Sequence, residues 1–139
     1  MIKRYEQFSH TADIGVRVFG RDLKELFENA AFSLFDTTCD LDGIKGSIEE
    51  GFSLEAPSDE ELLVAWLDEL LYYFYTKEII FFKFHVEKIE GHQLIAKAFG
   101  RLAKANKNRL KIEIKAATYH NLHIKRTADG LTVEMILDV

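Results

Sequence analysis

The sequence predicts an α+β fold, in which two amphipathic helices pack on one side of a mostly antiparallel β-sheet. Two segments repeat apolar residues at helical spacing, and a larger number alternate apolar and polar residues at the two-residue period of a strand. Most of the predicted strands follow one another through short turns, which join antiparallel neighbours. The 139 residues contain no proline- or glycine-rich linker and no internal repeat, so we expect one domain over residues 1–139.

Both predicted helices begin at capping sequences. Asp22 and Glu25 have the spacing of a capping box, and so do Ser58 and Glu61. The apolar stripe of the first helix consists of Leu23, Leu26, Phe27, Ala30, Ala31, Leu34 and Phe35. The stripe of the second consists of Leu62, Leu63, Trp66, Leu67, Leu70, Leu71 and Phe74. Each stripe is wide enough to cover a sheet face, and we expect its burial to stabilise the fold.

The predicted strands show two-residue alternation or short apolar stretches. They lie at residues 14–18, 52–54, 82–86, 94–99, 111–115, 122–124 and 133–137. Glu90-Gly91-His92 is a tight turn that makes residues 82–99 a hairpin, and Asp129-Gly130 is the turn before the last strand. The residues expected to share one face of a strand are Phe82, Phe84 and Val86 in the hairpin, and Val133, Met135 and Leu137 at the end.

Composition and charge narrow the class of function. Hydrophobic residues make up 47% and charged residues 29%, which is a globular composition, and no apolar run is long enough to span a membrane. The N-terminus becomes charged at once, so we expect no cleaved signal peptide. The net charge of −5 argues against sequence-independent nucleic-acid binding. Residues 100–139 nevertheless carry 8 basic and 4 acidic side chains, which suits a phosphate-bearing or acidic partner.

The common catalytic motifs are missing from this sequence. It contains no Walker or dinucleotide-binding glycine loop, no Gly-x-Ser-x-Gly turn and no His-Glu-x-x-His zinc motif. The acidic stretch 36–43 does not have the ligand spacing of an EF-hand loop. The single cysteine, Cys39, is expected to be a buried thiol and fits a reducing cytoplasm.

Two aspartates lie at the ends of predicted strands. Asp13 opens the first strand, and Asp138 is followed only by Val139 in the printed sequence. Antiparallel pairing of these strands would bring both carboxylates and the carboxylate of Val139 together, as a hard oxygen site for Ca²⁺, Mg²⁺ or Mn²⁺. The alternative is purely structural, with Asp13 capping a turn and Asp138 ending a strand.

Four segments of the chain resemble the archease family and occur in that family's order. They are His10-Thr11-Ala12-Asp13-Ile14-Gly15-Val16, Leu67-Asp68-Glu69-Leu70-Leu71-Tyr72, Glu113-Ile114-Lys115-Ala116-Ala117-Thr118-Tyr119-His120 and Ile136-Leu137-Asp138-Val139. The resemblance covers nearly the whole chain and implies the α+β archease fold.

The resemblance also implies a function. Archeases are accessory proteins and not enzymes. They activate an RtcB-type RNA ligase in tRNA splicing or RNA repair, by promoting metal- and GTP-dependent guanylylation and multiple turnover. The implied partner is that ligase, with tRNA reached only through it. The implied location is the cytoplasm, without membrane contact, and the implied cofactor is a divalent metal ion, calcium or else magnesium or manganese.

The resemblance assigns roles to individual residues. The family's metal-binding positions fall on Asp13, Asp138 and Val139. Lys115 matches a lysine of the second signature, and we expect it to be solvent-exposed and to act on the partner. His10 and His120 are further candidates for partner activation, and Asp40 is a second-rank candidate. The candidate site residues are therefore Asp13, Asp138, Val139, Lys115, His10, His120 and Asp40.

One residue departs from the family pattern, and two other functions stay open. Arg101 stands where the family usually has an acidic residue; if that residue helps to bind metal or partner in relatives, this protein has lost or moved the contact. One alternative function is a chaperone or specificity modulator of a tRNA methyltransferase. The other is a metal-dependent phosphate-ester hydrolase that uses the same carboxylates, against which stands the lack of a nearby nucleophile or general base.

Overall fold

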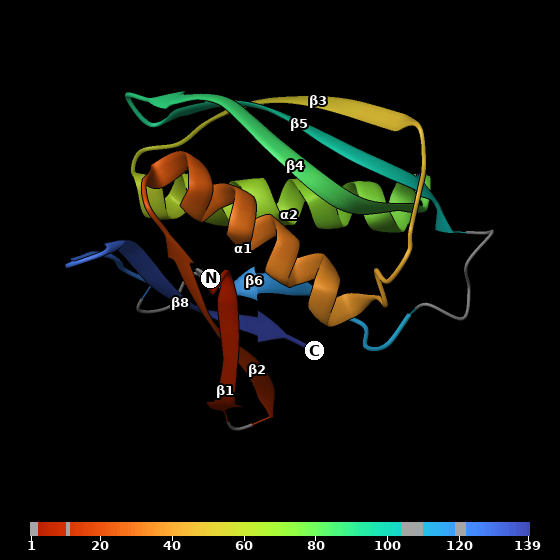
Figure 1. The fold of residues 1–139 in the computed structure, drawn as a ribbon, viewed down its shortest axis with the longest axis horizontal. Helices are drawn as coiled ribbons and strands as arrows, with labels where there is room; N and C mark the ends of the chain where they lie inside the picture. Colours follow the sequence, from red (N-terminus) through yellow and green to blue (C-terminus); the bar gives the residue numbers. More distant parts are fainter. Residues whose placement is uncertain (1–2, 11, 104–109, 119–121) are drawn as a thin grey trace.

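The structure is a computed structural model that describes residues 3–10, 12–103, 110–118 and 122–139. It confirms the predicted class, because two helices pack on antiparallel β-structure. The strands form two sheets, however, and not the single sheet that the sequence suggested. The helices lie between these sheets, as Figure 1 shows, so each helix is covered from more than one direction.

The two ends of the chain build one sheet and the middle builds the other. The five-stranded sheet contains β1 (Tyr5–His10), β2 (Asp13–Gly20), β6 (Ala116–Thr118), β7 (Ile124–Thr127) and β8 (Gly130–Asp138). Its order is β1-β2-β8-β6, and β7 also pairs with β8. The three-stranded sheet contains β3 (Ile48–Glu55), β4 (Ile79–Glu90) and β5 (Gln93–Leu102), in the order β3-β5-β4. All of these pairings are antiparallel.

The helices α1 (Leu23–Thr38) and α2 (Asp59–Lys77) begin at the predicted caps. The Asp22 carboxylate accepts a hydrogen bond of 2.9 Å from the Glu25 N–H. The Glu25 side chain returns to the N–H of Arg21, one residue before the expected partner. In α2, the Ser58 hydroxyl accepts from the Glu61 N–H at 3.1 Å. Each cap satisfies a backbone donor that the first turn leaves without a partner inside the helix.

The position of α1 between the sheets explains why it buries polar residues beside its apolar stripe. Asn29, Ser33 and Thr38 are all buried, although a helix on one side of a single sheet would expose that face. The Asn29 amide donates to the Phe19 carbonyl oxygen in β2 at 2.7 Å. On α2, the buried Trp66 indole donates to the Phe27 carbonyl oxygen at 3.0 Å. These bonds offset the desolvation of the buried polar groups and tie both helices to their surroundings.

Three strand predictions need correction. Residues 122–124 were expected to form a strand, but β7 runs over Ile124–Thr127, and β1 was not predicted. Phe82 was expected to share a face with Phe84, but a register irregularity between Phe81 and Lys83 turns Phe81 into the core instead. Residues 111–115 were expected to form a strand, but β6 begins only at Ala116. The backbone of this stretch bonds to other elements, since the Lys111 N–H donates to the Thr38 carbonyl oxygen at the end of α1.

The remaining hairpins and the core agree with the sequence pattern. Gly91 and His92 both have positive φ in the two-residue turn between β4 and β5, where Glu90 pairs with Gln93. Among the described helices, none is long and apolar enough to cross a membrane. The largest fully buried side chains come from both helices, the three-stranded sheet and the segment before β6, and include Trp66, Phe27, Phe35, Phe81, Leu67 and Ile114.

Candidate functional site

Strand register brings Asp13 and Asp138 to the same end of the five-stranded sheet. Ile14 in β2 pairs with Leu137 in β8, so Asp13 and Asp138 are the next residues beyond that pair on each strand. Neighbouring strands lie about 5 Å apart, and the alternation of side chains turns both aspartates away from the core-facing Leu137. Both side chains are half-buried. We call Asp13 and Asp138 the strand-end carboxylates.

Lys115 lies on the other side of Asp138. Its backbone N–H donates to the Asp138 carbonyl oxygen at 2.8 Å, and the following Ala116 is the register partner of Asp138 in β6. The Lys115 side chain is exposed, which confirms the prediction of its exposure. Val139 follows Asp138 and is 36% exposed. A cation and two carboxylates therefore gather at one sheet end, from segments far apart in the sequence.

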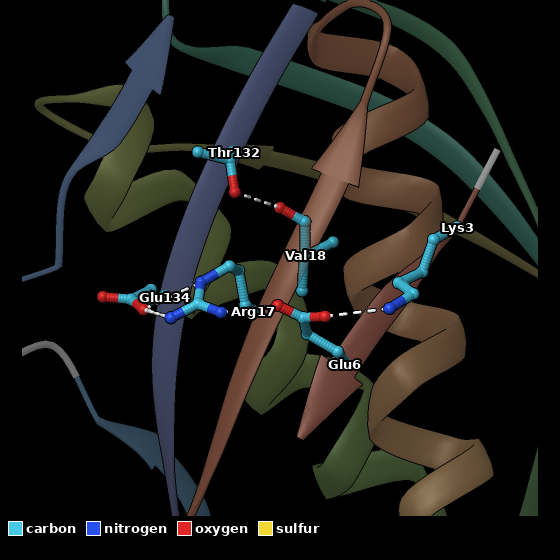
Figure 2. A network of polar contacts seen from close by, with 6 residues as sticks. All are labelled: Lys3, Glu6, Arg17, Val18, Thr132 and Glu134. Atoms are coloured by element: carbon cyan, nitrogen blue, oxygen red, sulfur yellow. Dashed lines mark hydrogen bonds and ion pairs between the residues drawn. The ribbon is translucent and has the colours of Figure 1, made fainter. Parts of the chain in front are cut away.

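A row of charged side chains across the same sheet supports this register. The Arg17 guanidinium in β2 lies between the carboxylates of Glu6 in β1 and Glu134 in β8, as Figure 2 shows. Arg17 is the register partner of both residues. Exposed pairs of this kind contribute little to stability, because solvent screens them. A slip by one residue would nevertheless break the row and separate Asp13 from Asp138, so the row favours the register of the site.

The other predicted site residues are placed less completely. His10 is the backbone partner of Asp13 across the turn between β1 and β2, but its side chain is outside the described residues, as is all of His120. Asp40 is exposed in the loop after α1, where its Oδ1 accepts from the Asp42 N–H at 3.0 Å. In the described part of the chain, no strand pairing connects Asp40 with the strand-end carboxylates. Its role stays a prediction.

The donor chemistry of the strand-end carboxylates suits a hard divalent cation, which prefers oxygen ligands. Among the described residues, no group of three or more His, Cys, Asp or Glu side chains is arranged to hold a metal ion. A cation at the two carboxylates therefore needs additional oxygen donors, such as the predicted carboxylate of Val139, water or a partner's oxygens. Arg101, the residue that departs from the family pattern, is not in the sheet that carries Asp13 and Asp138. It lies opposite Ile80 in the three-stranded sheet.

A surface hollow lies beside the candidate site. It measures about 500 Å³ and is lined by Gln7, Phe8, Ser9, Asp13 and Ile14. A larger hollow of about 650 Å³ lies at the opposite end of β2, against Phe19 and Gly20. The smaller hollow is the relevant one, because a strand-end carboxylate lines it.

Two side chains of α2 hold the Lys115 segment, and the sequence analysis assigned neither of them a role. The Asp68 carboxylate accepts from the Ala117 N–H at 3.1 Å. The Tyr75 hydroxyl donates to the Ile114 carbonyl oxygen at 2.5 Å. Burial raises the pKa of Asp68, and the bond from Ala117 opposes that shift. Burial and the nearby charge of Glu113 raise the pKa of Tyr75. The signals in the sequence were the position of Asp68 inside an apolar helical stretch and inside one of the four segments that resemble the archease family.

The fold and the site define the class of protein. It is a small α+β protein with a layer of helices between two antiparallel sheets, which presents two strand-end carboxylates and an exposed lysine at one sheet edge. A comparison of this sequence with models of known protein families shows to which family the chain belongs. The family model described as Archease protein family matches residues 5–139. The chain belongs to the archease family.

Individual relatives support this assignment over the full length of the chain. The protein archease of Methanosarcina acetivorans is 42% identical over 141 residues, which cover 99% of this chain and 97% of the relative. The protein archease of Pyrococcus furiosus is 36% identical over 132 residues and covers 93% of each chain.

Solved structures agree with the architecture. The solution structure of a protein from Methanobacterium thermoautotrophicum is 31% identical, with a TM-score of 0.84 over 99% of this chain and 100% of that one. A crystal structure from Thermotoga maritima, described as an archease and a possible chaperone, has a TM-score of 0.68 over 96% of each chain. At 24% sequence identity, this second likeness supports the fold alone.

Proposed function

We propose that this protein is an accessory protein that activates an RtcB-type RNA ligase in tRNA splicing or RNA repair. It promotes the metal- and GTP-dependent guanylylation of the ligase and allows multiple turnover, and it reaches tRNA only through the ligase. The observation that carries the proposal is the convergence of Asp13, Asp138 and Lys115 at one sheet end of an archease-family protein. These are the residues to which the family resemblance assigns metal and partner contacts.

The proposed cofactor is a divalent metal ion, calcium or else magnesium or manganese, held by Asp13, Asp138 and the carboxylate of Val139. A divalent cation would neutralise negative charge on the triphosphate that the ligase uses. The neighbouring carboxylates on β2 and β8 repel each other, so their arrangement favours a cation over an anion. Half-burial of both groups reduces screening by solvent and strengthens that preference.

Lys115 is proposed to contact the ligase or its bound nucleotide directly. Its ammonium is exposed, while its backbone is bonded to Asp138, so the charge projects from a held position. A lysine binds phosphate oxygens or a carboxylate as a point charge without fixed orientation. His10 and His120 are proposed as further partner contacts on the basis of the family resemblance.

Guanylylation of the cognate ligase with GTP, with and without this protein, tests the proposal. We expect the protein to accelerate formation of the ligase–GMP intermediate, and Asp138→Asn to lose most of that effect because it removes one strand-end carboxylate. Asp129→Asn, in the turn between β7 and β8, is a control that removes a carboxylate outside the site. Equal ligase–GMP formation with and without the protein would reject the proposal.

Two parallel assays address the alternative functions. A change in tRNA methylation without any change in ligase guanylylation would support a role with a methyltransferase. Turnover of a phosphate ester by the purified protein alone, lost in Asp138→Asn, would support a hydrolase instead.

A further inference from the structure

Helix α2 holds the segment around Lys115 at two points. The Tyr75 hydroxyl binds the carbonyl oxygen of Ile114, and the Asp68 carboxylate binds the N–H of Ala117. One contact lies before Lys115 in the sequence and the other lies after it. The N–H of Lys115 itself bonds to β8, at the Asp138 carbonyl oxygen. The short segment is therefore held between a helix and a strand.

The spacing of the two side chains along α2 matches the spacing of the two backbone groups that they bind. Asp68 and Tyr75 are seven residues apart, so they lie on one face of α2, about 10 Å apart along its axis. Three residues of extended chain, from Ile114 to Ala117, also span about 10 Å. Because Tyr75 meets the start of the segment and Asp68 meets its end, the segment runs antiparallel to the helix. The extended backbone from Ile114 to Ala117 is therefore just long enough to reach both side chains.

Side-chain burial orients the segment between these contacts. Ile114 and Ala117 are buried, with exposures of 0% and 5%, whereas Lys115 is exposed. Ile114 and Ala117 thus anchor the segment on either side of Lys115, whose own side chain is exposed. No described strand includes residues 111–115, so their backbone is held by single hydrogen bonds, which include those of Lys111 and Ile112 to the Thr38 carbonyl oxygen.

We infer that Asp68 and Tyr75 are positioning residues of the site, which hold the Lys115 segment against the end of β8 that carries Asp138 by binding the backbone on either side of Lys115. This inference rests on the proposed function. Both residues act through the segment 114–117 and not by touching the partner. The interaction of Asp68 needs an oxygen acceptor and not a negative charge, so asparagine should replace it, whereas alanine should not. For Tyr75, only the hydroxyl is needed.

Three variants, Asp68→Ala, Asp68→Asn and Tyr75→Phe, test the inference in two measurements on the full chain. The first is acceleration of ligase guanylylation at a temperature where each variant is fully folded. The second is amide hydrogen exchange of Lys115 and Ala117, compared with Val18 in β2. Loss of one hydrogen bond should lower the acceleration by about three- to tenfold and speed exchange at Lys115 and Ala117 by a similar factor. Exchange at Val18 should not change, and Asp68→Asn should behave like the unmodified chain.

Glu69→Ala and Tyr72→Phe serve as matched controls. Glu69 neighbours Asp68 on α2, and Tyr72 is an exposed tyrosine one turn before Tyr75. The inference is overturned if Asp68→Ala and Tyr75→Phe lower the acceleration no more than these controls, or if exchange speeds up equally at Val18. If Asp68→Ala does not fold, Tyr75→Phe alone decides. If the unmodified chain has no effect on the ligase, the proposed function fails, and the exchange data still show whether α2 holds the segment.

Discussion

The ring of Phe8 in β1 lies against the backbone of Gly15, its partner in β2. A Cβ atom on residue 15 would lie 2.3 Å from Phe8 Cε2, which is far inside van der Waals contact. The Arg17 guanidinium also lies 5.4 Å from the centre of this ring. Glycine at position 15 therefore lets the ring cross the sheet surface between Arg17 and the strand-end carboxylates. Glycine is required at position 15 because of this close approach of the Phe8 ring, and not because of the backbone angles of residue 15.

Gly15→Ala should destabilise the fold by about 1–3 kcal/mol, because the added methyl group forces the Phe8 ring away from β2. Urea denaturation of the unmodified chain and the variant measures the difference. The double variant Phe8→Ala, Gly15→Ala should cost less than the sum of its single changes, since the clash disappears with the ring. Strict additivity would contradict the contact.

Leu67→Ala should cost about 2–5 kcal/mol of unfolding free energy, because Leu67 is fully buried on α2 between the two sheets. Chemical denaturation measures this change. Tyr72→Ala on the exposed side of the same helix is the control, with an expected cost below about 1 kcal/mol. A cost below about 0.5 kcal/mol for Leu67→Ala would contradict the helix packing described here.

Lys115→Ala should leave the thermal unfolding midpoint nearly unchanged and strongly reduce activation of the ligase. The side chain is exposed, so its removal creates no cavity, but it takes away the proposed partner contact. Thermal unfolding and the guanylylation assay measure the two effects. Lys125→Ala, an exposed lysine of β7 in the same sheet, should change neither. Loss of folding in Lys115→Ala would instead indicate a structural role.

Extra residues after Val139 should weaken calcium binding and abolish ligase activation without unfolding the protein. An extension converts the carboxylate of Val139 into a neutral peptide group and places chain beside Asp138. Titration calorimetry with Ca²⁺ compares a chain that stops at Val139 with one that continues for several residues. The same extension placed before Met1 controls for added length. Equal calcium affinity and activation in all three forms would reject Val139 as a ligand.

Alkaline pH should destabilise the protein through Tyr5. Burial, the hydrogen bond to Asp36 and the charge of Asp36 raise the pKa of Tyr5 from 10.0 to about 12. Because the folded-state pKa lies above the unfolded-state value, this contribution is complete below pH 10 and is lost as the pH rises to about 12. Denaturation from pH 9 to 11.5 should show a steeper loss of stability for the unmodified chain than for Tyr5→Phe. Parallel curves would contradict the shift.

Local patterns in the sequence were enough to predict most elements of the fold. The caps at Asp22 and Ser58, the turn at Gly91 and the alternation along β8 depend on neighbours within a few residues. Hydrogen bonds and side-chain periodicity act at this range, so a sequence alone reports them. Asp13, Asp138 and Lys115 are candidate site residues through their resemblance to family signatures, and of these predictions the exposure of Lys115 is confirmed.

Only the tertiary structure decided how those elements share their apolar faces and which groups hold the site. A stripe of apolar residues shows that a helix is covered, but not that two sheets cover it from opposite sides, and so the burial of Asn29 and Ser33 was not predicted. Asp68 and Tyr75 meet residues 49 and 39 positions away, respectively. Contacts at such separations depend on strand register and helix placement, which arise when the whole core packs together.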